Sequence, residues 1–236
     1  MTESAQSPVA PAQLLSVPEL PADAKALSEA DAMALLLQAG VPVAPHGLAR
    51  DADEAVRVAE SIGYPVVVKL CSPDILHKSD VGGVVLNLSD ADAVRAAFER
   101  VRRAAGTARF DGALVARMVR GWGEIMVGVR RDPVFGLVAL AGIGGTAVEI
   151  FRQMSFGLAP VSRERARAML TQSRAAALCA GHRGHPPLDL DAVADVIVNV
   201  SRAADAIGER LDTLEINPFI VSADGLVAAD AVITLR

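Results

Sequence analysis

Apolar positions change their spacing along the chain, and each change predicts a different element. Residues 65–70 form a short β-branched run, which predicts a buried strand, and residues 84–88 predict a second strand. Apolar residues three and four positions apart predict helices, each closed by a glycine, over residues 28–40, 51–63 and 89–106. Other short apolar runs predict strands over residues 41–49, 112–119, 124–131 and 135–142.

The C-terminal part of the chain continues this mixture. A helix is predicted to begin within residues 145–154, and two longer helices are predicted over residues 162–181 and 189–209. Residues 211–235 predict a β-hairpin whose turn lies at residues 222–225. Helices and strands alternate without a repeated βαβ unit, so the sequence predicts an α+β fold, or an α/β fold with mixed sheets.

Composition and charge narrow the class of protein. Of 236 residues, 52% are hydrophobic, which is enough for a sizeable core. The formal net charge is −5 and no basic block is present, which argues against nucleic acid as the main partner. Cys71 and Cys179, the only cysteines, lack the spacing of a metal site, which favours free thiols in a reducing compartment.

The N-terminus has no basic start followed by an apolar core, and the longest uncharged run, residues 133–148, is broken by glycines and too short to span a membrane comfortably. We therefore expect a cytoplasmic protein without a membrane partner. Residues 1–22 are rich in proline and alanine and are expected to form a disordered tail. Residues 23–236 then form the folded domain.

The first candidate site lies in residues 63–88. Lys69 stands near the end of an apolar strand, where an unpaired ammonium is costly and a phosphate or a nearby carboxylate is the usual remedy. The loop that follows carries His77 and Lys78, then Gly82 and Gly83, whose backbone N–H groups can approach an anion closely. This combination predicts a clamp on a polyphosphate. The simpler interpretations are a lysine snorkelling at a strand end and a solvated loop histidine.

The second candidate site lies in the predicted C-terminal hairpin. Glu215 and Asn217 are two residues apart and share one face of a strand. A four-residue turn places Asp230 opposite Asn217, and a two-residue turn places it opposite Phe219. Both put Asp230 on the face of Glu215 and Asn217, whereas a three-residue turn does not. Pro218 cannot donate to a ladder and predicts an edge or a bulge at this point. Oxygen ligands with this spacing suit Mg²⁺; the alternative is a hairpin with solvated acids on its outer face.

The stretch GYPVVVKLCSPDILHKSDVGGV resembles the ATP-grasp domain of the ADP-forming (NDP-forming) acyl-CoA synthetases. The resemblance continues in the family's order through GVRRDPVFG, GIGG, RGHPPLD and LEINPFIV, and it covers residues 25–236 approximately. It implies an ATP-grasp fold, in which two α+β lobes hold ATP between them, with the smaller lobe at residues 45–120 or so.

The resemblance also implies roles for the candidate residues. Lys69 matches a lysine that contacts the nucleotide phosphates, and His77 matches a histidine assigned to a phosphoryl relay or to phosphate contact. The family carries its magnesium ligands in the pattern of Glu215, Asn217 and Asp230.

Met118, Val119 and Arg120 match a hinge whose backbone meets adenine, with Glu124 near ribose or phosphate; composition alone makes Glu124 a surface acid. The segment GIGGTA, residues 142–147, formally fits a dinucleotide fingerprint. We reject NAD because no strand with a final acidic residue follows about 20 positions on. Gly144 and Gly145 are retained as an anion-binding turn, where the family has its GxGG.

The implied reaction is acyl-CoA + ADP + phosphate ⇌ acid + CoA + ATP through a phosphohistidine, with ATP or ADP and Mg²⁺ bound by this chain. The motifs occupy most of the sequence, and a second domain needs on the order of 100 residues. We therefore expect a hetero-oligomer with a CoA-binding α-type subunit that carries the main phosphohistidine. The alternatives are a self-sufficient ATP-grasp ligase acting through an acyl-phosphate and a degenerate nucleotide-binding regulatory module.

Leu137, Gln153 and Gly157 depart from the family pattern, which makes full activity a weaker expectation than ATP binding.

Overall fold

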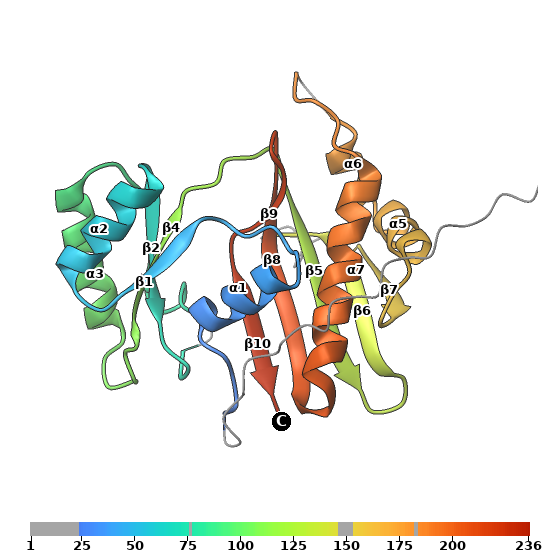
Figure 1. Ribbon diagram of the computed structural model, residues 1–236, viewed down its shortest axis with the longest axis horizontal. Coiled ribbons are helices and arrows are strands. Elements are labelled where there is room, and N and C mark those ends of the chain that lie inside the picture. The colour runs from blue at the N-terminus through green and yellow to red at the C-terminus, as the bar shows by residue number, and fades with distance from the viewer. Residues whose placement is uncertain (1–23, 76, 146–152, 182–183) are drawn as a thin grey trace, which may run out of the picture.

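The computed structural model describes residues 24–75, 77–145, 153–181 and 184–236. These residues build two lobes, each organised around one sheet (Figure 1). All strand pairings within the two sheets are antiparallel, and helices pack against both. The fold is therefore α+β, the first of the two predicted classes. The expected tail, residues 1–22, lies outside the described residues.

The smaller lobe is a four-stranded sheet covered on one face by α2 (Ala52–Ile62) and α3 (Ala91–Ala104) (Figure 1). Its strands, in pairing order, are β1 (His46–Ala49), β4 (Gly112–Arg117), β2 (Val66–Cys71) and β3 (Val84–Leu88). Val66, Val68 and Leu70 pack into the core beneath the helices. Because side chains alternate along a strand, Lys69 points to the opposite face, toward the larger lobe.

The larger lobe is a six-stranded sheet with helices on one face. In pairing order, five of its strands are β10 (Ala231–Leu235), β8 (Leu211–Ser222), β5 (Gly123–Asp132), β6 (Gly136–Ile143) and β7 (Met154–Leu158). The sixth, β9 (Gly225–Ala228), pairs with β8. The helices of its described residues are α1 (Glu29–Gln38), α5 (Arg163–Gln172), α6 (Ala175–Cys179), α7 (Leu190–Ile207) and the 3-10 turn η1 (Gly208–Arg210).

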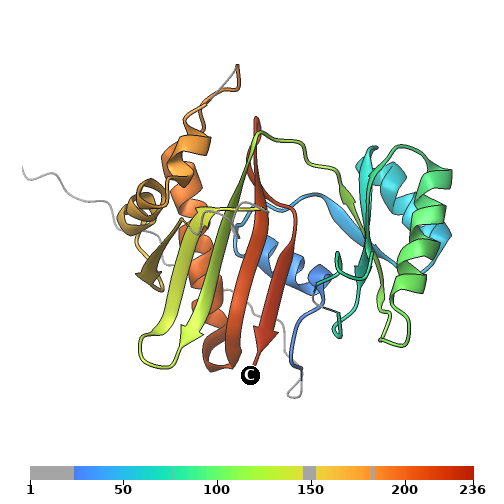
Figure 2. The same ribbon diagram turned by 180° about the vertical axis from the view of Figure 1, so that it is seen from behind.

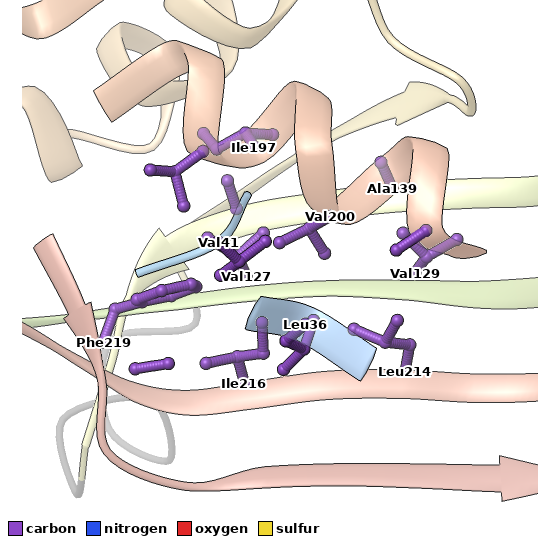
Figure 3. Packing of buried hydrophobic residues seen from close by; sticks show 14 of the residues in the cluster. Leu36, Val41, Val127, Val129, Ala139, Ile197, Val200, Leu214, Ile216 and Phe219 are labelled. Atoms are coloured by element: carbon purple, nitrogen blue, oxygen red, sulfur yellow. The ribbon is translucent and has the colours of Figure 1, made fainter. Parts of the chain in front are cut away.

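The core of the larger lobe forms where α7 and α1 pack on the sheet (Figure 3). Ile197 of α7 lies above Val127 of β5, while Leu36 of α1 packs beside Ile216 of β8. These side chains, with the ring of Phe219, are fully buried. Helix α1 precedes the smaller lobe in the chain but belongs to this core, so the chain passes between the lobes more than once.

The opposite face of the larger sheet has no described helix over it (Figure 2). Edge strand β7 presents Phe156 and Leu158 on this side, with 54% and 64% of their surface exposed. Phe135, in the turn between β5 and β6, is 68% exposed. The bare face therefore ends in an apolar surface, which we call the β6–β7 patch and define as Val134, Phe135, Phe156 and Leu158.

Two predicted elements differ from the structure, and a third lies mostly outside the described residues. The helix expected within residues 145–154 falls mostly on 146–152, outside the described residues, and Met154 already begins β7. The helix expected over residues 162–181 is broken at Arg174, whose φ of 61° is left-handed. The second strand of the hairpin is divided at Ala229 and Asp230. Apolar spacing missed both breaks because one or two irregular residues hardly change a period.

Two expectations about residue classes can be compared with the described residues. Cys71 and Cys179 are buried free thiols, and burial raises the pKa of Cys179 to about 11. Among the helices in the described part of the chain, none combines the length and the apolar character that a membrane crossing requires.

Phe219 provides a test of the larger core. Replacing it with alanine should cost about 3–5 kcal/mol of unfolding free energy, because its buried ring leaves a cavity between α7 and the sheet. Phe135→Ala is the matched control and should change stability by less than about 0.5 kcal/mol, because that ring is mostly in solvent. Urea unfolding of both variants measures the difference; equal midpoints would contradict this packing.

Candidate functional site

A cavity of about 260 Å³ lies between the two sheets. Lys69 and Val67 of β2 line it from the smaller lobe, and Pro218, Ile220 and Asp230 line it from the larger one. The segment between β4 and β5 closes it with Met118, Val119 and Glu124. Five predicted site residues from three parts of the chain thus meet in one cleft: Lys69, Met118, Val119, Glu124 and Asp230.

A second cavity of about 660 Å³ adjoins the cleft. Met118, Val119, Glu124 and Ile220 line both cavities, and Arg120 and Gly144 line only the larger one. Trp122 closes it on one side, where the indole stacks on the His185 ring with centroids 4.4 Å apart and donates a hydrogen bond to the carbonyl of Leu178. The predicted hinge, residues 118–120, therefore borders both hollows.

Four buried or half-buried charges meet at the inner end of the cleft. Lys69 Nζ donates a hydrogen bond to Glu29 Oε1 at 2.8 Å and another to the carbonyl of Ala229. Lys78 Nζ lies 2.9 Å from Glu29 Oε2 and 3.0 Å from Asp230 Oδ1. We call these four residues, Glu29, Lys69, Lys78 and Asp230, the charge cluster. The charge cluster joins two lysines of the smaller lobe, Lys69 on β2 and Lys78 in the loop after β2, to two carboxylates of the larger lobe.

The pKa shifts follow from burial and from charge. Burial, together with the negative charge of Asp230, raises the pKa of Glu29, although Lys69 and Lys78 act to lower it. Burial also acts to raise the pKa of Asp230, but Lys69 and Lys78 together outweigh it and hold that pKa below its usual value. For Lys78, burial favours the neutral form, and the two carboxylates outweigh it, so its pKa is raised. Asp230 and Lys78 therefore stay ionised near neutral pH.

The loop after β2 is held in a compact turn. The N–H of Gly83 donates to the carbonyl of Lys78 at 2.8 Å, and a Cβ at Gly83 would come within 3.0 Å of that oxygen and of the Leu70 side chain. Gly82 has a φ of 70°, which favours glycine. The turn directs Lys78 into the protein and leaves His77 exposed. His77, Gly82 and Gly83 do not line the cleft formed by the described residues.

The hairpin has the register that places Asp230 opposite Asn217. Ala231 pairs with Ile216 and Val221 pairs with Leu226, so the pairing register is the same on both sides of the break at Ala229 and Asp230. The ladder between β5 and β8 is irregular around Pro218, which confirms the bulge that proline predicts there.

Glu215 is half-buried, and burial raises its pKa, while the charge of nearby His77 acts in the opposite direction. Asn217 Oδ1 accepts the N–H of Gly145 at 2.8 Å. Two carboxylates and one amide oxygen suit Mg²⁺ when substrate phosphates complete its shell. Among the described residues, no group of three or more His, Cys, Asp or Glu forms a metal site by itself.

The glycine turn after β6 packs tightly on Glu124. The N–H of Gly144 donates to the carbonyl of Glu124 at 2.7 Å. A Cβ on Gly145, whose φ is +65°, would lie 1.6 Å from Glu124 Oε2. Glycine at position 145 thus lets the Glu124 carboxylate lie against the turn. The N–H of Gly145 also donates the hydrogen bond to Asn217.

Sequence reasoning missed two features of this site. Glu29 is only 6% exposed and pairs with both lysines. Its signal was present, because Glu29 lies three residues before Ala32 and seven before Leu36, on the apolar face of α1. The stacking of Trp122 on His185 had no local signal, since 63 positions separate the two residues (185 − 122).

A comparison with protein families agrees with this geometry. The family model for the ATP-grasp domain matches residues 20–235 of this chain. The chain belongs to the ATP-grasp family. The resemblance seen in the sequence is therefore confirmed, together with the fold that it implied.

Curated relatives of this ATP-grasp chain include ADP-forming ligases. "Acetate–CoA ligase [ADP-forming] I" of Archaeoglobus fulgidus is 43% identical over 204 residues, which are 85% of this chain and 30% of the relative. The β subunits of ADP-forming acetate–CoA ligases I and II of Pyrococcus furiosus are 38% and 37% identical, and each match covers 89% of this chain and 92% of the subunit. The chain thus spans less than a third of the first relative and nearly all of the two subunits.

Solved structures show the same likeness. Acetyl-coenzyme A synthetase 1 of Ca. Korarchaeum cryptofilum, in complex with coenzyme A and Ca-AMPCP, has a TM-score of 0.84 and 36% identity over 90% of this chain and 94% of its own. Another structure of that enzyme contains coenzyme A and Mg-AMPPCP, with a phosphohistidine segment pointing towards the nucleotide binding site. Its TM-score is 0.76 at 35% identity, over 90% of this chain and 93% of its own.

Gly145→Ala tests whether the glycine turn positions Glu124 for a nucleotide. The added methyl should displace the Glu124 carboxylate and weaken ADP binding about tenfold, equivalent to about 1.4 kcal/mol. Gly106→Ala is the matched control, because Gly106 also has a positive φ (57°) but open space around its Cβ position. Calorimetric titration with Mg-ADP compares the two variants. Wild-type affinity in Gly145→Ala would remove Glu124 from the nucleotide site.

Proposed function

We propose that the chain is the nucleotide-binding subunit or domain of an ADP-forming acyl-CoA synthetase. In this role it transfers a phosphoryl group between ATP or ADP and a phosphohistidine during the interconversion of an acyl-CoA and its acid. The observation that carries the proposal is the position of Lys69, whose ammonium lies at the inner end of the cleft beside Asp230 and below the hinge. The relatives named as β subunits of such ligases support it.

The cleft offers a complementary surface for each part of a nucleotide. Val67, Ile220 and Met118 provide apolar walls suited to a base, and backbone groups of residues 118–120 border the same space. Lys69, which lines the cleft, and Lys78, which contacts Asp230 of the cleft wall, supply the positive charge that phosphates require. Most of the catalysis of phosphoryl transfer consists of positioning and charge stabilisation, which this arrangement can provide.

Glu215, Asn217 and Asp230 are the residues that we assign to Mg²⁺. When bound, the metal would neutralise charge that develops on the phosphate oxygens. The chain's own part is to hold the three oxygens in place. The ladder register aligns Asp230 with Asn217, and the bond from Gly145 fixes the orientation of the Asn217 amide.

We assign the relay to His77. Its exposure leaves the imidazole free to meet a phosphoryl group. In the ATP-forming direction, an oxygen of the ADP β-phosphate attacks phosphorus, the P–N bond breaks, and the electron pair returns to the imidazole nitrogen. The neutral imidazole is a competent nucleophile for the reverse step.

The bare face of the larger sheet is the surface that we assign to the partner, a CoA-binding subunit that carries the main phosphohistidine. Glu215, Gly128, Leu140 and Phe156 form one cross-strand row on four neighbouring strands. Paired residues of antiparallel strands point to the same side, so the row leads from a proposed metal ligand to the β6–β7 patch, about 14 Å away. A partner seated on this patch reaches the phosphates along the sheet.

The same row contains a hollow that suits a side chain of the partner. Gly128 has no side chain, and a cavity of about 310 Å³ opens above it between Glu215, Leu140 and Arg130. An apolar contact region with a polar rim is the usual composition of a specific interface.

Two rival functions remain distinct from this one. A self-sufficient ligase would form an acyl-phosphate without a partner, and a degenerate module would bind nucleotide without transferring phosphate. The departures at Leu137, Gln153 and Gly157 motivate the second rival. At Gly157 a Cβ would meet Arg165 Nε and Met169 Sδ at 3.1 Å, so a long side chain has no room there in this chain.

The purified chain, with and without a CoA-binding partner subunit, separates the three functions. We expect the chain alone to bind Mg-ADP, with a stabilisation of about 2.7 kcal/mol at a hundredfold excess over Kd, and to make no ATP from acyl-CoA. Thermal unfolding and a coupled ATP assay provide the two measurements. Robust ATP synthesis by the chain alone would favour the self-sufficient ligase. Binding without transfer even beside the partner would favour the degenerate module.

His77→Ala tests the relay. The variant should bind Mg-ADP with wild-type affinity, because His77 does not line the cleft, but should lose transfer of the radiolabelled γ-phosphate of ATP to the partner. His46→Ala is the control; His46 lies on β1, with its Nδ1 2.8 Å from the carbonyl of Ala44. Acid-labile label on the partner provides the readout. Undiminished labelling by His77→Ala would reduce His77 to a loop residue.

A further inference from the structure

Glu29 is a buried carboxylate for which the proposed nucleotide chemistry has assigned no task. It stands in the first turn of α1, in the larger lobe, and it contacts both lysines of the smaller lobe. The helix N-terminus favours its negative charge. A carboxylate next to two phosphate-binding lysines competes with the phosphates, so its presence requires a reason other than nucleotide affinity.

The geometry around Lys78 supplies that reason. Lys78 donates a hydrogen bond to Asp230 Oδ1 at 3.0 Å, and the same oxygen accepts the N–H of Ala231 at 2.9 Å. The Lys78 ammonium therefore occupies a position next to Asp230, a proposed metal ligand, that a metal ion would otherwise take. A metal that binds Asp230 has to compete with the positive charge already in contact with it.

Glu29 Oε2 is the alternative partner for that ammonium. This oxygen is buried and already forms an ion pair with Lys78 Nζ at 2.9 Å, although that contact lacks the geometry of a hydrogen bond. The lysine side chain is flexible and carries three donors, so a small rotation turns a donor from Asp230 to Glu29. Lys78 can then release Asp230 without becoming an unpaired buried charge.

We propose that Glu29 is a positioning residue that accepts the charge of Lys78, so that Asp230 becomes available to the metal that accompanies the nucleotide. The proposal rests on the assignment of Asp230 to that metal. In the absence of nucleotide, Lys78 neutralises Asp230. When Mg-ADP binds, Lys78 turns to Glu29, which remains bonded to Lys69 through its other oxygen.

Mn²⁺ alone is the first probe, measured as the free-ion signal in electron paramagnetic resonance, without nucleotide or turnover. Glu29→Gln keeps the shape of the side chain and removes its charge, so Lys78 is left with Asp230 as its only carboxylate. Mn²⁺ affinity should fall at least tenfold. Lys78→Met removes the competing ammonium, and Mn²⁺ affinity should rise.

The double variant distinguishes displacement of Lys78 from a simple field effect. If Glu29 acts through Lys78, Glu29→Gln should change Mn²⁺ affinity by less than threefold in the Lys78→Met background. If Glu29 acts only as a distant negative charge, its effect should be the same in both backgrounds, and the proposal is overturned. Glu60→Gln, an exposed glutamate on α2, is the control and should leave Mn²⁺ affinity unchanged.

Calorimetry with ADP, with and without Mg²⁺, provides the second readout. Glu29→Gln should reduce the gain in ADP affinity that Mg²⁺ confers by about tenfold, while metal-free ADP binds as well as before or better, because the cluster gains a positive charge. Glu29→Asp should restore part of the gain. Equal loss with and without Mg²⁺ would show a structural role only. If Glu29→Gln does not fold, Lys78→Met alone still tests the proposal, because an Mn²⁺ affinity that fails to rise would overturn it.

The wild-type titrations separate this proposal from the assignment beneath it. A wild-type chain that binds ADP equally with and without Mg²⁺ would refute the metal assignment of Asp230, and the role of Glu29 with it. A wild-type chain with a clear metal dependence that Glu29→Gln preserves in full would leave the nucleotide site standing and overturn only the role of Glu29.

Discussion

The need to neutralise two buried lysines determines how the two lobes meet. Lys69 and Lys78 belong to the smaller lobe and are each only 6% exposed, which would be very costly for unpaired ammonium groups. Their carboxylate partners, Glu29 and Asp230, come from the larger lobe. Removing one partner of such a group costs more than the pair contributes, because a charge is left without compensation. The lobes are therefore coupled at the point where the cleft is deepest.

Several irregularities of the chain serve that meeting point. The last hairpin strand is interrupted at Ala229 and Asp230, so a backbone carbonyl and a carboxylate are freed from the ladder and reach the lysines. The bulge at Pro218 interrupts the neighbouring ladder at the same level. Gly83 and Gly145 allow two turns to approach where a methyl group would collide. Regular helices and strands thus form the framework of the two lobes, and the irregular positions between them form the candidate nucleotide site.

The larger sheet divides its two faces between folding and function. One face is buried under α7 and α1 and forms the core of the larger lobe (Figure 3). The other carries Glu215, the hollow over Gly128 and, at edge strand β7, exposed aromatic and aliphatic side chains. An exposed apolar edge is a liability for an isolated chain. Our assignment of this face to a partner subunit gives that liability a function, and it agrees with relatives that are named as β subunits.

The sequence by itself determined the elements whose period is long and regular, such as the buried strand Val66–Cys71 and the helix Ala91–Ala104, and its motifs identified the family. It also determined that Lys69 needs a counter-charge, because the cost of burying an ammonium does not depend on the fold. Only the tertiary structure decided that Glu29 supplies this charge, that Lys78 turns inward, and that Asp230 is already occupied by a lysine. These contacts join residues 40, 49 and 152 positions apart (69 − 29, 78 − 29 and 230 − 78). Local periodicity carries no information about such pairs, because their distance is set by the packing of the two lobes.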